Sequence, residues 1–124
     1  MTTDSALVRA EALCEVLRGY RFSYNNEARL QQAIESVLRE HGYAFVREKR
    51  LSRKDRPDFD VEGIAIEVKV DESLTVVLRQ LFRYAQQAAV QVIVLVTTRA
   101  SHTRVPEAIC GKPVRIVHIV GALA

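Results

Sequence analysis

The sequence predicts a mixed α/β domain, with a central sheet flanked by helices. Apolar residues recur at helical spacing in three segments, and shorter extended apolar runs lie between and after them. The predicted order is helix, helix, three strands, helix, strand, strand, which favours a mixed sheet with one crossover helix. A chain of 124 residues is long enough for one core, so residues 1–124 are expected to form a single domain.

Three amphipathic helices are expected. The first covers about residues 5–20. Either Asn25 or Asn26 caps the second helix, and Gly42 ends it. The third begins after Ser73 as its cap and ends near Ala89. The apolar face of the second helix consists of Leu30, Ile34, Val37 and Leu38.

Five extended segments are expected, at residues 43–51, 58–61, 64–70, 92–96 and 113–120. Glu62-Gly63 supplies a tight turn between the second and third segments, which should therefore pair as an antiparallel hairpin. The fourth segment is almost continuously apolar, as expected of a strand buried on both faces.

Composition is that of a globular domain, since 48% of the residues are apolar and 27% are charged. No apolar run approaches the roughly 18 residues that a membrane span needs, so no membrane partner is expected. The first residues do not read as a secretory signal, which favours a cytoplasmic location. Cys14 and Cys110 stand in no metal or disulfide spacing and are expected to be reduced, buried thiols.

An acid and an amine share one face of the predicted hairpin. Residues two apart on a strand point the same way, so Glu67 and Lys69 are neighbours, and Asp58 on the partner strand can pair beside Glu67. Two carboxylates facing one ammonium suit phosphodiester hydrolysis with a divalent cation. The alternative is that Glu67 and Lys69 belong to the solvated face of the hairpin.

The pattern Pro57-Asp58 followed by Glu67-Val68-Lys69 resembles the PD-(D/E)XK nuclease superfamily. The resemblance covers about residues 24–100 and leaves out the first helix and the C-terminal segment. It implies a restriction endonuclease-like core, with element order α-βββ-α-β and an extra N-terminal helix. It further implies a DNA-cleaving enzyme that uses Mg²⁺, for which Mn²⁺ can substitute.

In that superfamily an acidic residue on the helix before the three strands often completes the metal site. Glu27 is the best matching position, and Glu35 is the alternative. The resemblance therefore implies a metal site of Asp58, Glu67 and Glu27. A first-turn acid that complements the helix dipole would equally explain Glu27.

Gln80 and Tyr84 lie one helical turn apart on the third helix and project together. This Gln-x-x-x-Tyr spacing resembles the motif in nuclease domains of bacterial recombination exonucleases, where it implies substrate contact near the catalytic lysine. Arg79 and Arg83 on the same helix are candidates for phosphate binding. The alternative is that these residues simply form the solvent-exposed polar face of an amphipathic helix.

A basic cluster precedes Asp58, where a nucleic acid entering the site would pass. Its members are Arg47, Lys49, Arg50, Arg53, Lys54 and Arg56, and we expect Arg53, Lys54 and Arg56 to bind substrate. A charged edge strand that resists aggregation is the alternative. His102 is interpreted as a phosphate contact or a surface residue.

The sequence thus favours a Mg²⁺-dependent deoxyribonuclease. Alternatives are a catalytically inactive nucleic-acid-binding module of the same fold and an assembly subunit. The small size resembles stand-alone archaeal Holliday junction resolvases, which work as dimers, whereas Gln-x-x-x-Tyr resembles exonucleases. A homodimer that makes paired cuts is compatible with so short a chain.

Overall fold

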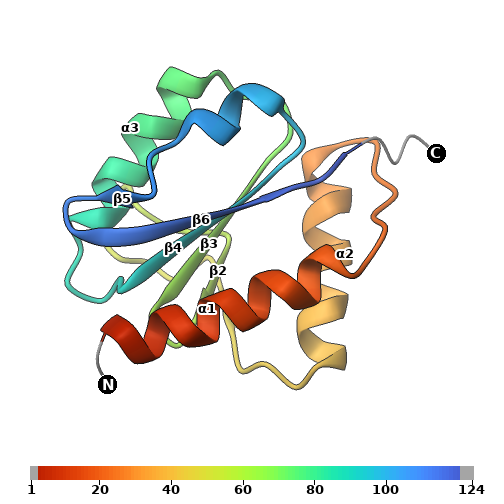
Figure 1. Cartoon of the computed structure of the whole chain (residues 1–124), viewed down its shortest axis with the longest axis horizontal. Coiled ribbons are helices and arrows are strands. Elements are labelled where there is room, and N and C mark those ends of the chain that lie inside the picture. Colours follow the sequence, from red (N-terminus) through yellow and green to blue (C-terminus); the bar gives the residue numbers. More distant parts are fainter. Residues whose placement is uncertain (1–2, 121–124) are drawn as a thin grey trace.

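The computed structural model describes residues 3–120 and has three layers, with a six-stranded mixed sheet between helices (Figure 1). The strand order is β1-β2-β3-β4-β6-β5. α1 (Thr3–Arg18) and α2 (Glu27–Glu40) cover one face, and α3 (Leu74–Ala85) covers the other. The mixed α/β class predicted from the sequence is confirmed.

Both helices on the first face bury the apolar stripe that the sequence predicts, and Leu30, Ile34, Val37 and Leu38 of α2 lie in the core. Asn26, not Asn25, caps α2, because its side-chain oxygen accepts a hydrogen bond from the Arg29 amide at 2.9 Å. Gly42 follows the helix with a φ of 73°, a conformation that glycine adopts without strain.

The first three strands form an antiparallel meander, β1 (Val46–Arg47), β2 (Phe59–Val61) and β3 (Ile64–Lys69). Glu62 and Gly63 both have positive φ in the turn, as a tight two-residue hairpin requires, so the predicted hairpin is confirmed. The strand predicted at residues 43–51 is too long. Glu48 takes a φ of 49° directly after β1, which ends the extended conformation.

A crossover through α3 joins β3 to β4 (Val92–Thr97), which pairs parallel to it and is buried throughout, as predicted. α3 ends at Ala85, earlier than the predicted Ala89. The amide of Gln86 bonds to the Arg83 carbonyl, which tightens the last turn. Lys112 Nζ then donates to the carbonyls of Gln87 and Val90 and holds the following turn in place.

The C-terminal part adds β6 (Lys112–His118) parallel to β4, one residue earlier than the segment predicted to begin at Pro113. The sequence did not predict the short edge strand β5 (Ala108–Ile109) or the 3₁₀ helix η1 (Ala100–Arg104). Both elements are short, with too few residues to give a periodic signal.

None of the described helices is long and apolar enough to cross a membrane. A cytoplasmic location stays a prediction. Cys14 is a free, buried thiol, as expected, and burial raises its pKa to about 11. The same expectation is wrong for Cys110, which is exposed at a φ of 50° in the turn between β5 and β6.

Replacing the cap of α2 tests this local analysis. Asn26→Ala should lower the free energy of unfolding by about 1 kcal/mol, because the Arg29 amide loses its partner. Asn25→Ala is the matched control and should change the value by less than about 0.5 kcal/mol. Urea denaturation followed by circular dichroism measures both, and equal losses would contradict the cap assignment.

Candidate functional site

Asp58 and Glu67 lie side by side across the β2–β3 hairpin. The register pairs Phe59 with Ile66, so the preceding residue Asp58 stands opposite Glu67. The Val68 amide donates to Asp58 Oδ2 at 2.7 Å, and the Asp58 amide donates to Glu67 Oε1 at 3.3 Å. The sequence prediction that pairing brings these two carboxylates together is confirmed.

Lys69 completes the acid and amine group, with Nζ 3.0 Å from Glu67 Oε2. Alternation along β3 turns Glu67 and Lys69 toward α3, whereas Ile66 and Val68 face α1 and α2. Glu67 is 3% exposed and Lys69 is 8% exposed. The interpretation as a solvated hairpin face is therefore wrong, because α3 covers that face.

Tyr84 and Gln80 of α3 reach the same group. The Tyr84 hydroxyl donates to Glu67 Oε1 at 2.9 Å, and Gln80 Nε2 donates to the Tyr84 hydroxyl at 3.0 Å. Tyr84 is fully buried, so its contact is with the carboxylate and not with the molecular surface. Gln80 Oε1 is buried with no hydrogen-bond partner within residues 3–120. Substrate contact by these two residues stays a prediction.

Burial dominates the electrostatics of the two acids. Desolvation, followed by the negative charge of Glu67, raises the pKa of Asp58 to about 7. Desolvation also raises the pKa of Glu67, although Lys69 and Tyr84 oppose the shift. Placing a negative charge on both carboxylates is therefore costly unless a cation lies nearby.

The two acids also change the pKa values of Lys69 and Tyr84. Burial alone would lower the pKa of Lys69, but the Glu67 carboxylate more than offsets it, with help from Glu27 and Asp58. Burial raises the pKa of Tyr84, and the charge of Glu67 raises it further. Lys69 is therefore an ammonium and Tyr84 a neutral hydrogen-bond donor at neutral pH.

The donor chemistry of this group fits a hard divalent cation. Within the part of the chain that the structure describes, Asp58 Oδ1 has no hydrogen-bond partner, and no three His, Cys, Asp or Glu side chains form a ready-made metal centre. Mg²⁺ commonly takes one or two carboxylates and fills its other positions with water and substrate phosphate. Asp58 and Glu67 suit that mode of binding.

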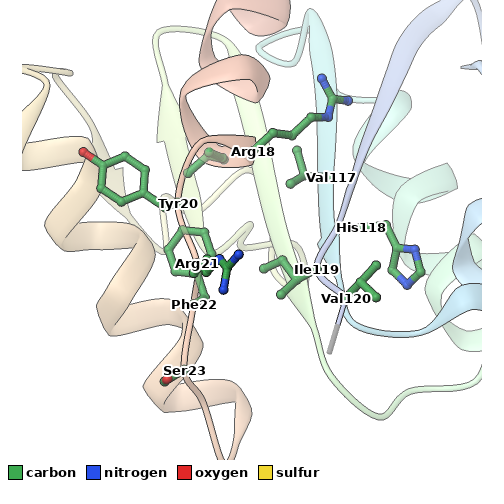
Figure 2. A pocket seen from close by; sticks show the side chains of 10 residues that line it. Arg18, Tyr20, Arg21, Phe22, Ser23, Val117, His118, Ile119 and Val120 are labelled. Carbon is green, nitrogen blue, oxygen red and sulfur yellow. The ribbon is translucent and has the colours of Figure 1, made fainter. Parts of the chain in front are cut away.

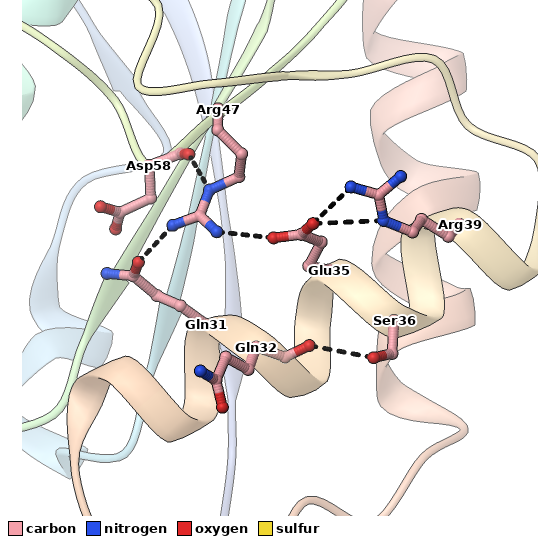
Figure 3. A network of polar contacts seen from close by, with 7 residues as sticks. All are labelled: Gln31, Gln32, Glu35, Ser36, Arg39, Arg47 and Asp58. Carbon is pink, nitrogen blue, oxygen red and sulfur yellow. Dashed lines mark hydrogen bonds and ion pairs between the residues drawn. The ribbon is translucent and has the colours of Figure 1, made fainter.

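Glu35 is occupied elsewhere. Its two carboxylate oxygens bind Arg47 and Arg39, each at 2.6 Å (Figure 3). Hydrogen bonds from Arg39 and Arg47 lower the pKa of Glu35. Glu27, half-buried in the first turn of α2, lies close enough for its charge to raise the pKa values of Asp58 and Lys69. Of the two acids that the sequence offered for this position, Glu27 is therefore the candidate third ligand.

Arg47 joins α2 to the backbone at Asp58. Its Nε donates to the Asp58 carbonyl at 3.1 Å, and a second nitrogen donates to Gln31 Oε1 at 2.7 Å (Figure 3). The guanidinium also lies 4.5 Å from the centre of the Phe59 ring. The sequence placed Arg47 in a basic cluster facing a polyanion, but the structure gives it a fixed internal role beside Glu35.

The other predicted substrate-binding cations lie on two elements that meet. Arg53, Lys54 and Arg56 are exposed on the loop before Asp58, and Arg79 is exposed on α3. Arg83 of α3 binds Asp55 of that loop, with Nε 2.8 Å from Oδ1. The structure therefore brings the two predicted basic segments together through an ion pair that the sequence did not indicate.

His102 is fully buried, so its interpretation as a surface residue or phosphate contact is wrong. Its ring nitrogens contact Thr97 Oγ1 and, at 2.7 Å, the Glu72 carbonyl. These bonds tie η1 to the end of β4 and to the loop before α3. The Glu72 carbonyl comes from 30 residues earlier in the chain, so no local pattern could have indicated this contact.

A cavity of about 610 Å³ lies between residues 17–23 and the end of β6 (Figure 2). No carboxylate lines it. A smaller hollow of about 420 Å³ lies beside Glu27 and is also lined by Asn25, Asn26, Val70, Asp71 and Glu72. Chemistry, and not cavity size, therefore identifies the candidate site.

A scan against protein-family models, a comparison with curated proteins and a search of solved structures each found no match to this chain. The structure by itself defines a mixed α/β domain in which half-buried Asp58, directly before β2, lies beside buried Glu67 and Lys69 of β3.

The raised pKa of Asp58 predicts how stability depends on pH. The unfolded carboxyl ionises near its ordinary value of 3.8, whereas the folded one ionises near 7. Its contribution to stability is therefore full below 3.8 and is lost as pH rises through about 7. Without metal, Asp58→Asn should be more stable than the parent at about pH 8, because no second buried charge forms.

Thermal unfolding in chelator, from about pH 5 to about pH 8, measures this effect. The parent should lose stability more steeply than the Asp58 variant as pH rises. Asp4→Asn, which changes an exposed acid on α1, is the control and should follow the parent. Parallel curves for parent and Asp58→Asn would contradict the assigned shift.

Proposed function

We propose that this protein is a Mg²⁺-dependent nuclease that hydrolyses DNA phosphodiester bonds, with Mn²⁺ able to substitute. The observation that carries the proposal is the group of half-buried Asp58 with buried Glu67 and Lys69, in which the ammonium lies 3.0 Å from one of two adjacent carboxylates. Two acids that share one face with an amine suit metal-assisted hydrolysis of a phosphodiester.

The arrangement of elements supports a restriction endonuclease-like core as part of this proposal. α2, the β1–β3 meander, α3 and β4 follow one another in the order α-βββ-α-β, and α1 precedes them. This order is what the resemblance to the PD-(D/E)XK superfamily implies for about residues 24–100. β5 and β6 extend the sheet beyond that core.

In the proposed mechanism, Asp58 and Glu67 would hold Mg²⁺, with Glu27 as the candidate third ligand. The bound ion would polarise the phosphoryl oxygen and make water a stronger nucleophile. Lys69, an ammonium beside Glu67, would orient the attacking water and offset the negative charge that develops on the phosphate. Its partial burial strengthens that electrostatic effect.

Tyr84 and Gln80 would act on this group from α3. The Tyr84 hydroxyl fixes Glu67 Oε1 and leaves Oε2 to Lys69, so each oxygen of that carboxylate has a defined neighbour. Gln80 orients the Tyr84 hydroxyl and carries an unpartnered buried oxygen that a substrate group could engage. α3 would therefore position both the carboxylate and the substrate.

A nucleic acid, and DNA by the resemblance above, is the proposed substrate because exposed cations lie on two elements next to the carboxylates. Arg53, Lys54, Arg56 and Arg79 are exposed on the loop before Asp58 and on α3. A single copy of so short a chain can cover little of a duplex, so a homodimer that makes paired cuts is included in the proposal.

Removing the lysine tests the catalytic assignment. Lys69→Ala should lower the rate of DNA cleavage in Mg²⁺ by about 100-fold or more, because charge stabilisation at the phosphate is lost. Labelled linear, nicked, single-stranded and four-way-junction DNA should be compared, with chelator as the blank. Arg104→Ala removes an exposed cation from η1 and should retain the parent rate.

Metal-dependent cutting that disappears in Lys69→Ala supports the nuclease. Binding of every DNA without cutting, in Mg²⁺ and in Mn²⁺, would instead favour the inactive nucleic-acid-binding module. An equal rate in Lys69→Ala and the parent would show that this lysine takes no part in the chemistry.

Glu27 and Glu35, the two candidate ligands on α2, provide a separate test of the metal site. Glu27→Gln should weaken Mn²⁺ binding by roughly tenfold or more. Glu35→Gln should leave Mn²⁺ affinity close to the parent value, because Glu35 is bound to Arg39 and Arg47. Isothermal titration calorimetry measures both, with circular dichroism to verify folding. The reverse ranking would move the third ligand to Glu35.

A further inference from the structure

We propose that Asp55 is a positioning residue that fixes a cationic loop for nucleic-acid binding. The loop comprises residues 51–56, and we call it the basic loop. The identity of the ligand rests on the proposed function, but the geometry of the loop does not. Asp55 has no role in the proposed chemistry, although it is a buried acid three residues before Asp58.

Asp55 uses nearly all of its hydrogen-bonding capacity inside the protein. Oδ1 accepts from Arg83 Nε at 2.8 Å, and Oδ2 accepts from Ser52 Oγ at 2.9 Å. The Asp55 carbonyl accepts from the Leu51 amide at 2.8 Å, and the Asp55 amide donates back to Ser52 Oγ at 3.2 Å. The side chain is 6% exposed, so one buried acid closes the loop on itself and fastens it to α3.

The same fold displays the cations of the basic loop outward. Arg53, Lys54 and Arg56 are exposed, and the structure gives their charged groups no ion-pair partner within residues 3–120. Leu51 packs partly buried against the core beneath α3. The loop therefore has a buried side made by Leu51 and Asp55, and an outer side made by three cations.

The anchor of the basic loop adjoins the catalytic group. Arg83, which binds Asp55, directly precedes Tyr84, which donates to Glu67 at 2.9 Å. At the other end, the loop leads through Pro57 into Asp58. The loop cations therefore have a fixed place relative to the proposed catalytic carboxylates. Nucleic-acid phosphates bound to these cations would set where the sugar-phosphate backbone lies relative to Asp58.

Charge and position predict opposite effects when Asp55 is neutralised. As a negative charge among cations, Asp55 weakens the attraction for phosphates, so its removal would tighten binding if charge alone mattered. As an anchor, Asp55 orders the loop before DNA binds and so lowers the entropic cost of binding. Its removal would then weaken binding. The direction of the change therefore decides between the two readings.

The test is the affinity of Asp55→Asn for labelled single-stranded and duplex DNA, measured by fluorescence anisotropy in chelator so that no cleavage occurs. We expect about tenfold weaker binding than that of the parent, because the cationic loop must then lose conformational entropy when it binds DNA. Asp4→Asn makes the same change of charge on α1 and should bind as the parent does, or slightly more tightly.

Ser52→Ala is the second variant, because it removes the Ser52 hydroxyl from Asp55 without changing any charge. It should weaken binding in the same direction. Limited trypsin digestion after Arg53 and Lys54 measures the flexibility of the loop in the absence of DNA. Cleavage there should be faster in both variants than in the parent. Circular dichroism and the thermal midpoint verify that each variant is folded.

Weaker binding with faster digestion supports the proposal. Binding of Asp55→Asn that equals or exceeds that of the parent would overturn it, as would weaker binding without faster digestion. The result is independent of the nuclease assignment. If the variants bind DNA more weakly than the parent but the parent never cuts DNA, only the proposed chemistry is contradicted. If the parent cuts DNA and Asp55→Asn binds as tightly as the parent, only the loop proposal is contradicted.

Discussion

The placement of Asp58 opposite Glu67, beneath α3, is the constraint on which the rest of the site depends. Burying a carboxylate costs several kcal/mol unless it is paired, and here two lie together beside one ammonium. The surrounding contacts offset this cost in part. Two backbone amides and the Tyr84 hydroxyl donate to the carboxylates, and Lys69 supplies one positive charge. A divalent cation would supply the positive charge that is still needed to balance the two carboxylates.

The neighbouring elements hold that pair from two sides of the sheet. From the α2 side, Arg47 binds the Asp58 carbonyl and is itself fixed by Glu35. From the α3 side, Tyr84 binds Glu67, and the preceding residue, Arg83, binds the basic loop through Asp55. The α2 side thus fixes the backbone at Asp58, and the α3 side fixes the carboxylate of Glu67.

Local signals in the sequence predicted most of the fold. The hairpin register follows from Glu62-Gly63, and it alone places Asp58 beside Glu67. The contacts of Arg47 with Glu35 and of Arg83 with Asp55 join residues 12 and 28 positions apart, and no periodic pattern carries such information. Both arginines read as surface cations in the sequence, because their partners appear only when the helices pack on the sheet.

The central claim is that the carboxylate pair of Asp58 and Glu67 is a divalent-cation site. A crystal structure of the protein soaked in MnCl₂ near pH 8, with anomalous diffraction data, tests it most directly. The account predicts one Mn²⁺ bound to both Asp58 and Glu67, at the distances of about 2.0–2.3 Å usual for carboxylate oxygens on such metals. An anomalous map with no peak at these carboxylates, or with Mn²⁺ bound only elsewhere, would contradict it.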